Sequence, residues 1–120
     1  MKTVLVPLAK GFEEIEAVTI IDVLRRAQID VIVASLDREA LVQGANGIVV
    51  EADVSIDNVV IDILDMIILP GGWDGTYVLA EDKIVQNALR EMEALGKNIA
   101  AICAAPFALH KAGVLSQNFT

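Results

Sequence analysis

The sequence predicts an α/β fold: a doubly wound, mostly parallel sheet with helices on both faces. Segments rich in Val, Ile and Leu alternate along the chain with amphipathic segments, which is typical of successive strand–helix–strand units. Hydrophobic residues make up 55% of the 120 residues, as expected where strands are buried on both faces. No apolar run approaches the roughly 18 residues of a membrane span. Residues 1–120 are therefore interpreted as a single domain.

The first elements are a strand, a helix and a second strand. Residues 3–8, rich in Val and Leu, predict the first strand, and residues 10–12 predict a loop. Residues 13–27 predict a helix, because glutamates open the segment and two arginines close it, which suits the helix dipole. Residues 30–36 predict a second, β-branched strand.

The second half continues the alternation. An Asn-Gly pair between alternating apolar residues predicts a hairpin over 42–50. Residues 63–69 predict a buried strand that stops at a Pro-Gly-Gly turn, and 82–95 predict an amphipathic helix ended by a glycine. Residues 98–102 predict a further strand, and 105–112 a closing helix.

Three unusual segments follow predicted strands: 10–16, 70–75 and 103–106. In doubly wound sheets, ligands bind beyond the carboxyl ends of the strands, where the winding reverses. We therefore expect these segments to converge on a functional site.

Cys103 is the only cysteine, and it stands where an apolar strand meets a helix. Pro106 fits the first turn of that helix, where its missing N–H costs no hydrogen bond. A thiol at such a junction faces free backbone N–H groups and the positive end of a helix dipole, which both stabilise a thiolate. Cys103 is thus a candidate nucleophile on a tight turn like a nucleophile elbow. The alternative is a buried structural cysteine.

Two backbone N–H groups are candidates for stabilising an oxyanion. Gly71 and Gly72 follow a buried strand, and a glycine backbone can approach a reacting atom closely. The N–H of Gly72 would be one donor, and the N–H of Ala104, directly after the candidate nucleophile, would be the second. The alternative for the glycine pair is a plain turn.

Three glutamates lie at the start of the first helix. Solvated positions that complement the helix dipole explain Glu13 and Glu14. Glu16 has mostly apolar neighbours, so a carboxyl buried there would stay protonated and donate a hydrogen bond to a thiolate or act as a general acid. The alternative is that Glu16 also only complements the dipole.

Several functions lack the residues that they need. A net charge of −8 argues against nucleic acid and anionic membranes as partners. One cysteine allows no internal disulfide, and the first strand leaves no room for a signal peptide, so we expect a cytoplasmic location. The sequence has no nucleotide-binding glycine motif and no metal-ligand spacing, so we predict no cofactor and no metal. His110 lies about 10 Å beyond Cys103 along the same helix, too far for a catalytic pair.

The helix over 13–27 is apolar over most of its circumference. A helix that packs one face on a sheet needs only an apolar stripe. The additional apolar surface predicts a homodimer through this helix. Burial beneath another element of the same chain is the alternative.

Four stretches together resemble the ThiJ/PfpI superfamily, and within it the branch of the parkinsonism-associated protein deglycase and YajL. They are Leu8-Ala9-Lys10-Gly11-Phe12-Glu13-Glu14-Ile15-Glu16, Asp22-Val23-Leu24-Arg25-Arg26, Leu69-Pro70-Gly71-Gly72 and Ala100-Ala101-Ile102-Cys103-Ala104-Ala105-Pro106. The resemblance implies a flavodoxin-like sandwich, often dimeric through the first helix, that uses no cofactor. It implies Cys103 as the reactive cysteine, Glu16 as the protonated carboxyl in contact with it, and Gly72 and Ala104 as backbone donors.

Two features depart from the family's pattern. An arginine that the deglycase branch carries in the hairpin, at an anion pocket, is replaced by Asn46-Gly47, although Arg26 is present. Family members also continue through further strands and helices, which include a histidine or aromatic residue of the pocket. Because Phe119-Thr120 looks like the start of a strand, we expect an N-terminal fragment of the fold. We expect its C-terminal remainder to pack against it in a folded specimen.

The resemblance implies functions of two classes. The first is a cysteine-dependent, cofactor-free enzyme that acts on small reactive carbonyls or glycated adducts, of the glyoxalase III or protein deglycase type. Peptidase or amidase action belongs to the same class. The second is a redox-sensing chaperone, in which Cys103 oxidises to a sulfinate stabilised by Glu16 and the helix start. The residue types of the pocket fit both classes.

Overall fold

The computed structural model describes residues 1–115, and the strand expected to begin at Phe119 lies outside them. Within this range, the strands are β1 (Thr3–Leu8), β2 (Asp30–Ser35), β3 (Leu41–Gln43), β4 (Val49–Glu51), β5 (Val54–Ser55), β6 (Met66–Leu69) and β7 (Asn98–Ala101). The α-helices are α1 (Glu14–Arg26), α2 (Trp73–Glu81), α3 (Lys83–Ala94) and α4 (Pro106–Ala112). Two 3-10 turns, η1 (Ile56–Asn58) and η2 (Ile61–Ile63), connect β5 to β6.

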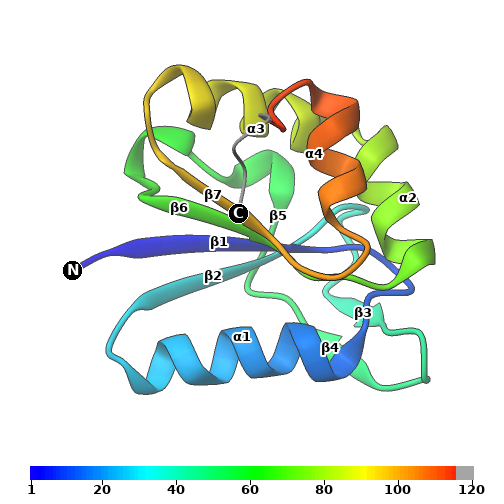
Figure 1. The fold of residues 1–120 in the computed structure, drawn as a ribbon. Coiled ribbons are helices and arrows are strands. Elements are labelled where there is room, and N and C mark those ends of the chain that lie inside the picture. The colour runs from blue at the N-terminus through cyan, green and yellow to red at the C-terminus, as the bar shows by residue number, and fades with distance from the viewer. Residues whose placement is uncertain (116–120) are drawn as a thin grey trace.

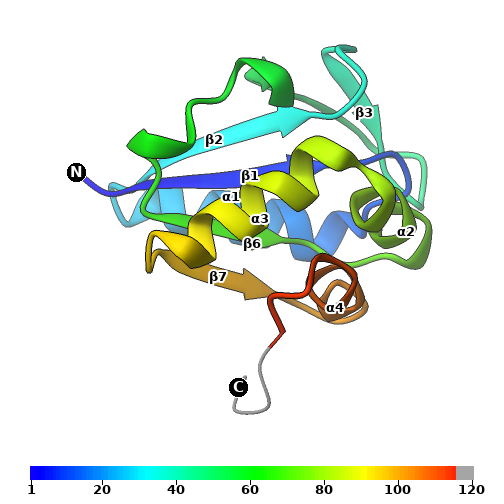
Figure 2. The ribbon, with the colours of Figure 1, turned by 90° about the horizontal axis from the view of Figure 1, so that it is seen from above.

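Five strands form one parallel sheet in the order β5–β2–β1–β6–β7. The chain winds outward from β1 to β2 and β5, then returns to β6 on the other side of β1, so the winding reverses between β1 and β6. Helix α1 covers one face of the sheet, and α2, α3 and α4 lie on the other (Figures 1 and 2). The predicted doubly wound α/β class is confirmed. The predicted hairpin is the separate antiparallel pair β3–β4.

The sheet has a hydrophobic core on each face. Val4 and Val6 of β1 pack in the core beneath α1, which also contains Ala17. Leu5, between them in the sequence, points the other way and packs in the core that contains Leu89 of α3. Successive side chains of a strand alternate between the faces, so a strand covered on both sides is apolar at every position. This arrangement accounts for the high apolar content of the chain.

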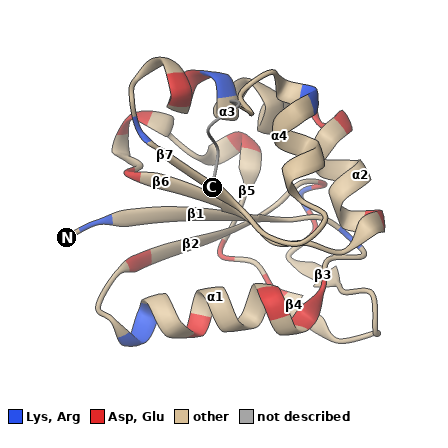
Figure 3. Ribbon diagram, in the orientation of Figure 1, with Lys and Arg blue, Asp and Glu red and all other residues tan. Residues whose placement is uncertain are grey.

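The charged side chains of helix α1 are distributed to suit the helix dipole. Glu13 is the N-cap, and its carboxylate accepts a hydrogen bond from the backbone N–H of Ile15. Acidic side chains lie at the start of α1 and the basic side chains Arg25 and Arg26 at its end (Figure 3). The acidic side chains lie near the positive end of the helix dipole and the basic side chains near its negative end, which stabilises the helix as predicted. With 13 residues, α1 is far shorter than a bilayer is thick, and no helix within residues 1–115 is long and apolar enough to span one.

The sequence did not predict α2. Its first turn contains Trp73, Asp74 and Gly75 directly after the glycine pair, a composition typical of a loop. The structure explains the glycine, because a Cβ on Gly75 would lie 2.9 Å from the backbone nitrogen of Phe12. Gly75 therefore lets α2 pack directly on the loop after β1. As a result, α2 begins immediately at the carboxyl end of the sheet.

We predict that Leu89→Ala lowers the free energy of unfolding by about 2–5 kcal/mol, because Leu89 is fully buried between α3 and the sheet. Leu95→Ala, the same change at an exposed position just after α3, serves as the control and should change it by less than about 1 kcal/mol. Urea denaturation followed by circular dichroism measures both. Equal losses in the two variants would contradict this assignment of the core.

Candidate active site

The loops after β1, β6 and β7 converge at the carboxyl edge of the sheet, as predicted. The N–H of Glu13 donates to the carbonyl oxygen of Gly71 at 2.9 Å, which joins the first loop to the second. The N–H of Ile102 donates to the carbonyl oxygen of Leu69 at 3.2 Å, which joins the third loop to the end of β6. Gly72, with φ of +94°, fits tightly against the loop after β1, because a Cβ there would lie 2.6 Å from the carbonyl oxygen of Gly11.

Cys103 lies at the turn between β7 and α4 and has a φ of +60°. Positive φ is unfavourable for a residue with a Cβ, and such strain is concentrated at functional sites. The thiol is exposed within the described chain, so the alternative of a buried structural cysteine does not describe this structure. Pro106 begins α4 as predicted.

Gly71 brings Glu16 and Cys103 together. Its N–H donates to Oε1 of Glu16 at 2.9 Å. A Cβ on Gly71 would clash with that same oxygen and would lie 2.8 Å from the Cβ of Cys103. The two side chains therefore lie against the same Cα, and only glycine leaves room for both. The sequence analysis made the N–H of Gly72 a candidate donor and assigned no role to Gly71.

The Glu16 carboxyl is half-buried. Oε1 accepts the Gly71 N–H, and within residues 1–115 no hydrogen bond joins the carboxyl to the thiol of Cys103. Glu16 thus lies beside Cys103, and the backbone of Gly71 holds its carboxyl. Within the described residues, the Gly71 N–H is the hydrogen-bond partner of this carboxyl, through Oε1.

The N–H groups of Gly72 and Ala104 are available as donors. Neither donates to a backbone acceptor within the described part of the chain. Gly72 directly follows Gly71, and Ala104 directly follows Cys103, so the two predicted donors are sequence neighbours of the residues that meet at this point.

Comparison with known proteins identifies the family of the chain. The model of the DJ-1/PfpI family matches residues 2–120. The chain belongs to the DJ-1/PfpI family. Protein dj-1beta of Drosophila melanogaster is 44% identical over 115 residues, which cover 96% of this chain and 62% of that protein. A protein from Pyrococcus abyssi named as a deglycase is 35% identical over 112 residues, which cover 93% of this chain and 66% of that protein.

The fold is shared with solved members of the family. The structure of oxidized DJ-1 from Toxoplasma gondii superposes with a TM-score of 0.92 at 42% identity, covering 96% of this chain and 63% of that one. The present chain thus spans a little over three fifths of the length of these relatives.

Glu14 corrects an expectation from the sequence. It was interpreted as a solvated residue that complements the dipole, but only 4% of it is exposed. Its Oε2 accepts the backbone N–H groups of Asn46 and Ile48 at 2.7 and 3.1 Å, and its Oε1 accepts from Nδ2 of Asn46 at 2.9 Å. Burial raises the pKa of Glu14, but the hydrogen bonds from Asn46 and Ile48 outweigh burial and hold this pKa below its ordinary value.

Asn46, at the tip of the hairpin, is bound to Glu14, so the start of α1 holds the hairpin. Arg26 is not joined to the hairpin, because its Nε donates to Oδ1 of Asp22 at 3.0 Å on the exposed surface of α1. The contact between Glu14 and Asn46 joins residues 32 positions apart, and no local sequence signal indicates it.

His110 lies exposed in the last turn of α4, as predicted. His110 lies at the far end of α4 from Cys103, which agrees with the expectation that the two do not form a catalytic pair. Within residues 1–115, no group of three or more His, Cys, Asp and Glu side chains is arranged to hold a metal ion.

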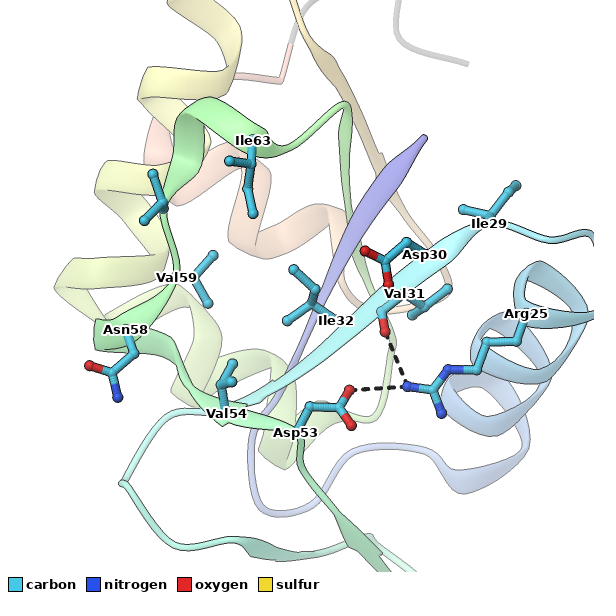
Figure 4. A pocket seen from close by; sticks show the side chains of 11 residues that line it. Arg25, Ile29, Asp30, Val31, Ile32, Asp53, Val54, Asn58, Val59 and Ile63 are labelled. Carbon is cyan, nitrogen blue, oxygen red and sulfur yellow. Dashed lines mark hydrogen bonds and ion pairs between the residues drawn. The ribbon is translucent and has the colours of Figure 1, made fainter. Parts of the chain in front are cut away.

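A separate cavity of about 440 Å³ lies along the outer edge of β2 (Figure 4). Its walls are mainly aliphatic. The guanidinium of Arg25 is already bound there, since it donates to the carbonyl oxygen of Val31 at 3.1 Å and to Oδ2 of Asp53 at 3.0 Å. The same Asp53 oxygen accepts the N–H of Val33 at 2.9 Å. Arg25 and Asp53 thus satisfy backbone groups along the edge of β2 that β5 does not cover.

We predict that acidification releases the hairpin from α1. Because the pKa of Glu14 is lowered by folding, its stabilising contacts are complete above the ordinary carboxyl value of 4.5 and are lost as the pH falls through the lowered value. The amide NMR shifts of Asn46 and Ile48 should follow this titration. Glu14→Gln should abolish the titration and lower the melting temperature.

Glu13→Gln is the matched control, because the Glu13 carboxylate accepts only the N–H of Ile15, at 3.4 Å on the exposed surface. This variant should keep the wild-type titration of the hairpin amides. Identical behaviour of the two variants would show that Glu14 does not hold the hairpin.

Proposed function

We propose that this DJ-1/PfpI protein is a cysteine-dependent, cofactor-free enzyme acting on small reactive carbonyls such as methylglyoxal, or on their glycated adducts. The observation that carries the proposal is the placement of Glu16 and Cys103 against the same Gly71 Cα. A nucleophile and a proton-transfer group side by side on the strands' carboxyl edge form the minimal machinery for carbonyl addition.

Each group has a distinct role in the proposed reaction. The thiolate of Cys103 adds to the carbonyl carbon, and the carbonyl oxygen gains the negative charge. The N–H groups of Gly72 and Ala104 donate hydrogen bonds to that oxygen. Glu16 then moves the protons that convert the hemithioacetal of methylglyoxal into a thioester, and water hydrolyses the carbon–sulfur bond to release lactate and the free Cys103 thiol. None of these steps uses a metal or an organic cofactor.

The related Pyrococcus abyssi protein supports this proposal, because its name assigns it a deglycase activity. A site that adds a thiol to a carbonyl suits both a free dicarbonyl such as methylglyoxal and the hemiaminal that its aldehyde forms on a protein side chain, because the second carbonyl is still present in the hemiaminal. A reducing cytoplasm would keep Cys103 in the free form that the reaction needs.

A redox-sensing role is the second candidate. It is favoured by the exposure of the thiol beside two available backbone donors, and a related Toxoplasma gondii structure is described as oxidized. A peroxide would oxidise the thiolate first to a sulfenic and then to a sulfinic acid. Gly72 and Ala104 would donate to one sulfinate oxygen as they would to an oxyanion, and the protonated carboxyl of Glu16 would donate to the other.

We also propose a homodimer through α1. Of its apolar residues, Ile15 is 77% and Val18 45% exposed, so the surface expected from the sequence is present in the described chain. Ile21, by contrast, is buried against the sheet.

For the enzyme, we predict that Cys103→Ala lowers methylglyoxal turnover by about 10³-fold or more, because it removes the nucleophile. Glu16→Gln and Glu16→Asp should each lower turnover by about 10²- to 10⁴-fold, because neither moves a proton from the original position. Lactate formation measured with purified protein tests this. His110→Ala is the control and should keep wild-type turnover.

Full turnover by Cys103→Ala would overturn the enzymatic proposal. Full turnover by both Glu16 variants, with loss only in Cys103→Ala, would reduce Glu16 to a residue that complements the dipole.

For the dimer, we predict that Ile15→Glu and Val18→Glu each yield monomers in light scattering, because a charge would be buried in the interface. Ile84→Glu places the same charge on an exposed position of α3, on the opposite face of the sheet, and should leave the dimer intact. A dimer that persists in both α1 variants would locate the interface elsewhere.

A further inference from the structure

The cavity at the outer edge of β2 exists because β5 covers only the end of that strand. β5 pairs with β2 at Ala34 and Ser35, the last two residues of the strand. The chain then leaves the sheet through η1 and η2 and returns as β6 on the far side of β1. Residues 29–32 are left beside a cavity of about 440 Å³, the edge cavity, and Val59 and Ile63 lie across it (Figure 4).

The walls of the edge cavity are held in place from both sides. On the side of α1, the Arg25 guanidinium binds the carboxylate of Asp53 at 3.0 Å. On the other side, Nζ of Lys97 donates to the carbonyl oxygens of Ile61 and Asp62 at 3.1 and 2.9 Å, which ties η2 to the residue before β7. A cavity that is formed before its ligand arrives binds that ligand with a smaller loss of conformational entropy.

The lining of the edge cavity is aliphatic and partly open to water. Val60 and Ile63 are each 57% exposed, and the half-buried side chains of Ile29, Ile32 and Val59 also line the cavity. A ligand that covers these side chains removes apolar surface from water, which is favourable. The lining therefore favours a ligand with an aliphatic body.

One uncompensated negative charge lies at the edge cavity. The charged residues that line the cavity are Arg25, Asp30 and Asp53. Arg25 and Asp53 form an ion pair at 3.0 Å and compensate each other. Asp30 is exposed, and within residues 1–115 its carboxylate takes part in no ion pair or hydrogen bond. The field at the cavity therefore attracts a cation beside Asp30 and repels an anion.

We propose that the edge cavity binds a small aliphatic amine. The alkyl chain of the amine lies against Ile32 and Ile63, and its ammonium group lies at the carboxylate of Asp30. This site is separate from the candidate active site, because Asp30 is at the amino end of β2, whereas Cys103 lies beyond the carboxyl ends of the parallel strands. Binding in the edge cavity does not depend on any reaction at Cys103.

An NMR titration of methyl-labelled protein tests the proposal, with hexylamine, 1-hexanol and hexanoate as probes of equal chain length. Hexylamine should shift the methyl signals of Val54, Val60 and Ile63 in a saturable way. At low salt it should bind about fivefold more tightly than hexanol, because an ion pair at an exposed carboxylate makes a modest contribution. Hexanoate should bind most weakly. Equal affinities for the three probes, or shifts that do not saturate, would overturn the proposal.

Variants separate the contribution of the charge from that of the apolar wall. Asp30→Asn should weaken hexylamine binding about fivefold and leave hexanol binding unchanged. Glu93→Gln removes the same charge from an exposed position of α3 and should leave the binding of both probes unchanged. Equal effects of these two variants would contradict an ammonium site at Asp30.

Ile63→Ala should weaken hexylamine and hexanol to the same extent, by about three- to tenfold, because it removes apolar contact area. Ile84→Ala makes the same change at an exposed position of α3 and should weaken neither probe. An Ile63→Ala protein that keeps the wild-type affinities would locate the alkyl chain outside the edge cavity and overturn the proposal.

Lysine side chains carry the same ammonium group on an alkyl chain, so Nα-acetyl-lysine methylamide is titrated as a fourth probe. It should bind more weakly than hexylamine, since its two peptide groups would lose hydration at the aliphatic walls. Tighter binding of the lysine probe would overturn the assignment to a free amine and would indicate a lysine-bearing polypeptide as the ligand.

Discussion

The hydrogen bond from the N–H of Gly71 to Oε1 of Glu16 is the contact on which the candidate site depends. It joins the first helix to the turn after β6 and holds the carboxyl beside Cys103. The contact is compatible with the cysteine only because Gly71 has no Cβ, since any side chain there would meet both Glu16 and Cys103. The candidate site therefore depends on the missing side chain of Gly71 as much as on the side chains of Glu16 and Cys103.

The topology of the sheet brings Glu16 and Cys103 close to Gly71. The winding of the sheet reverses between β1 and β6, so the chain leaves these neighbouring strands toward opposite faces, and doubly wound sheets bind their ligands at such a point. Two glutamates two residues apart on α1 then have separate tasks. Glu16 faces Gly71, whereas Glu14 binds the tip of the hairpin. The start of α1 thereby positions the Glu16 carboxyl of the candidate site and also binds the neighbouring hairpin through Glu14.

Local patterns in the sequence were sufficient for the fold class, the hairpin at Asn46-Gly47 and the position of Cys103 between strand and helix. They failed where a residue's role depends on distant contacts. Glu14 looked like a solvated helix residue because Asn46, its partner, lies on another element. Helix α2 was missed because Gly75 suggests a loop, although it is needed for packing on Phe12. Trp73 and Tyr77 stack because α2, which the sequence did not predict, makes residues four apart neighbours on one face of a helix.

The rate at which iodoacetamide alkylates Cys103 in Gly71→Ala tests the central claim most directly. A Cβ at this position displaces Glu16 or the cysteine, so the rate at pH 6 should fall by about tenfold or more relative to wild type. Gly96→Ala makes the same change at a glycine with φ of +69° and no atom within 4 Å of the added carbon. It should lower stability and leave the alkylation rate unchanged. An unchanged rate in a folded Gly71→Ala protein would contradict the claim that Gly71 holds Glu16 and Cys103 together.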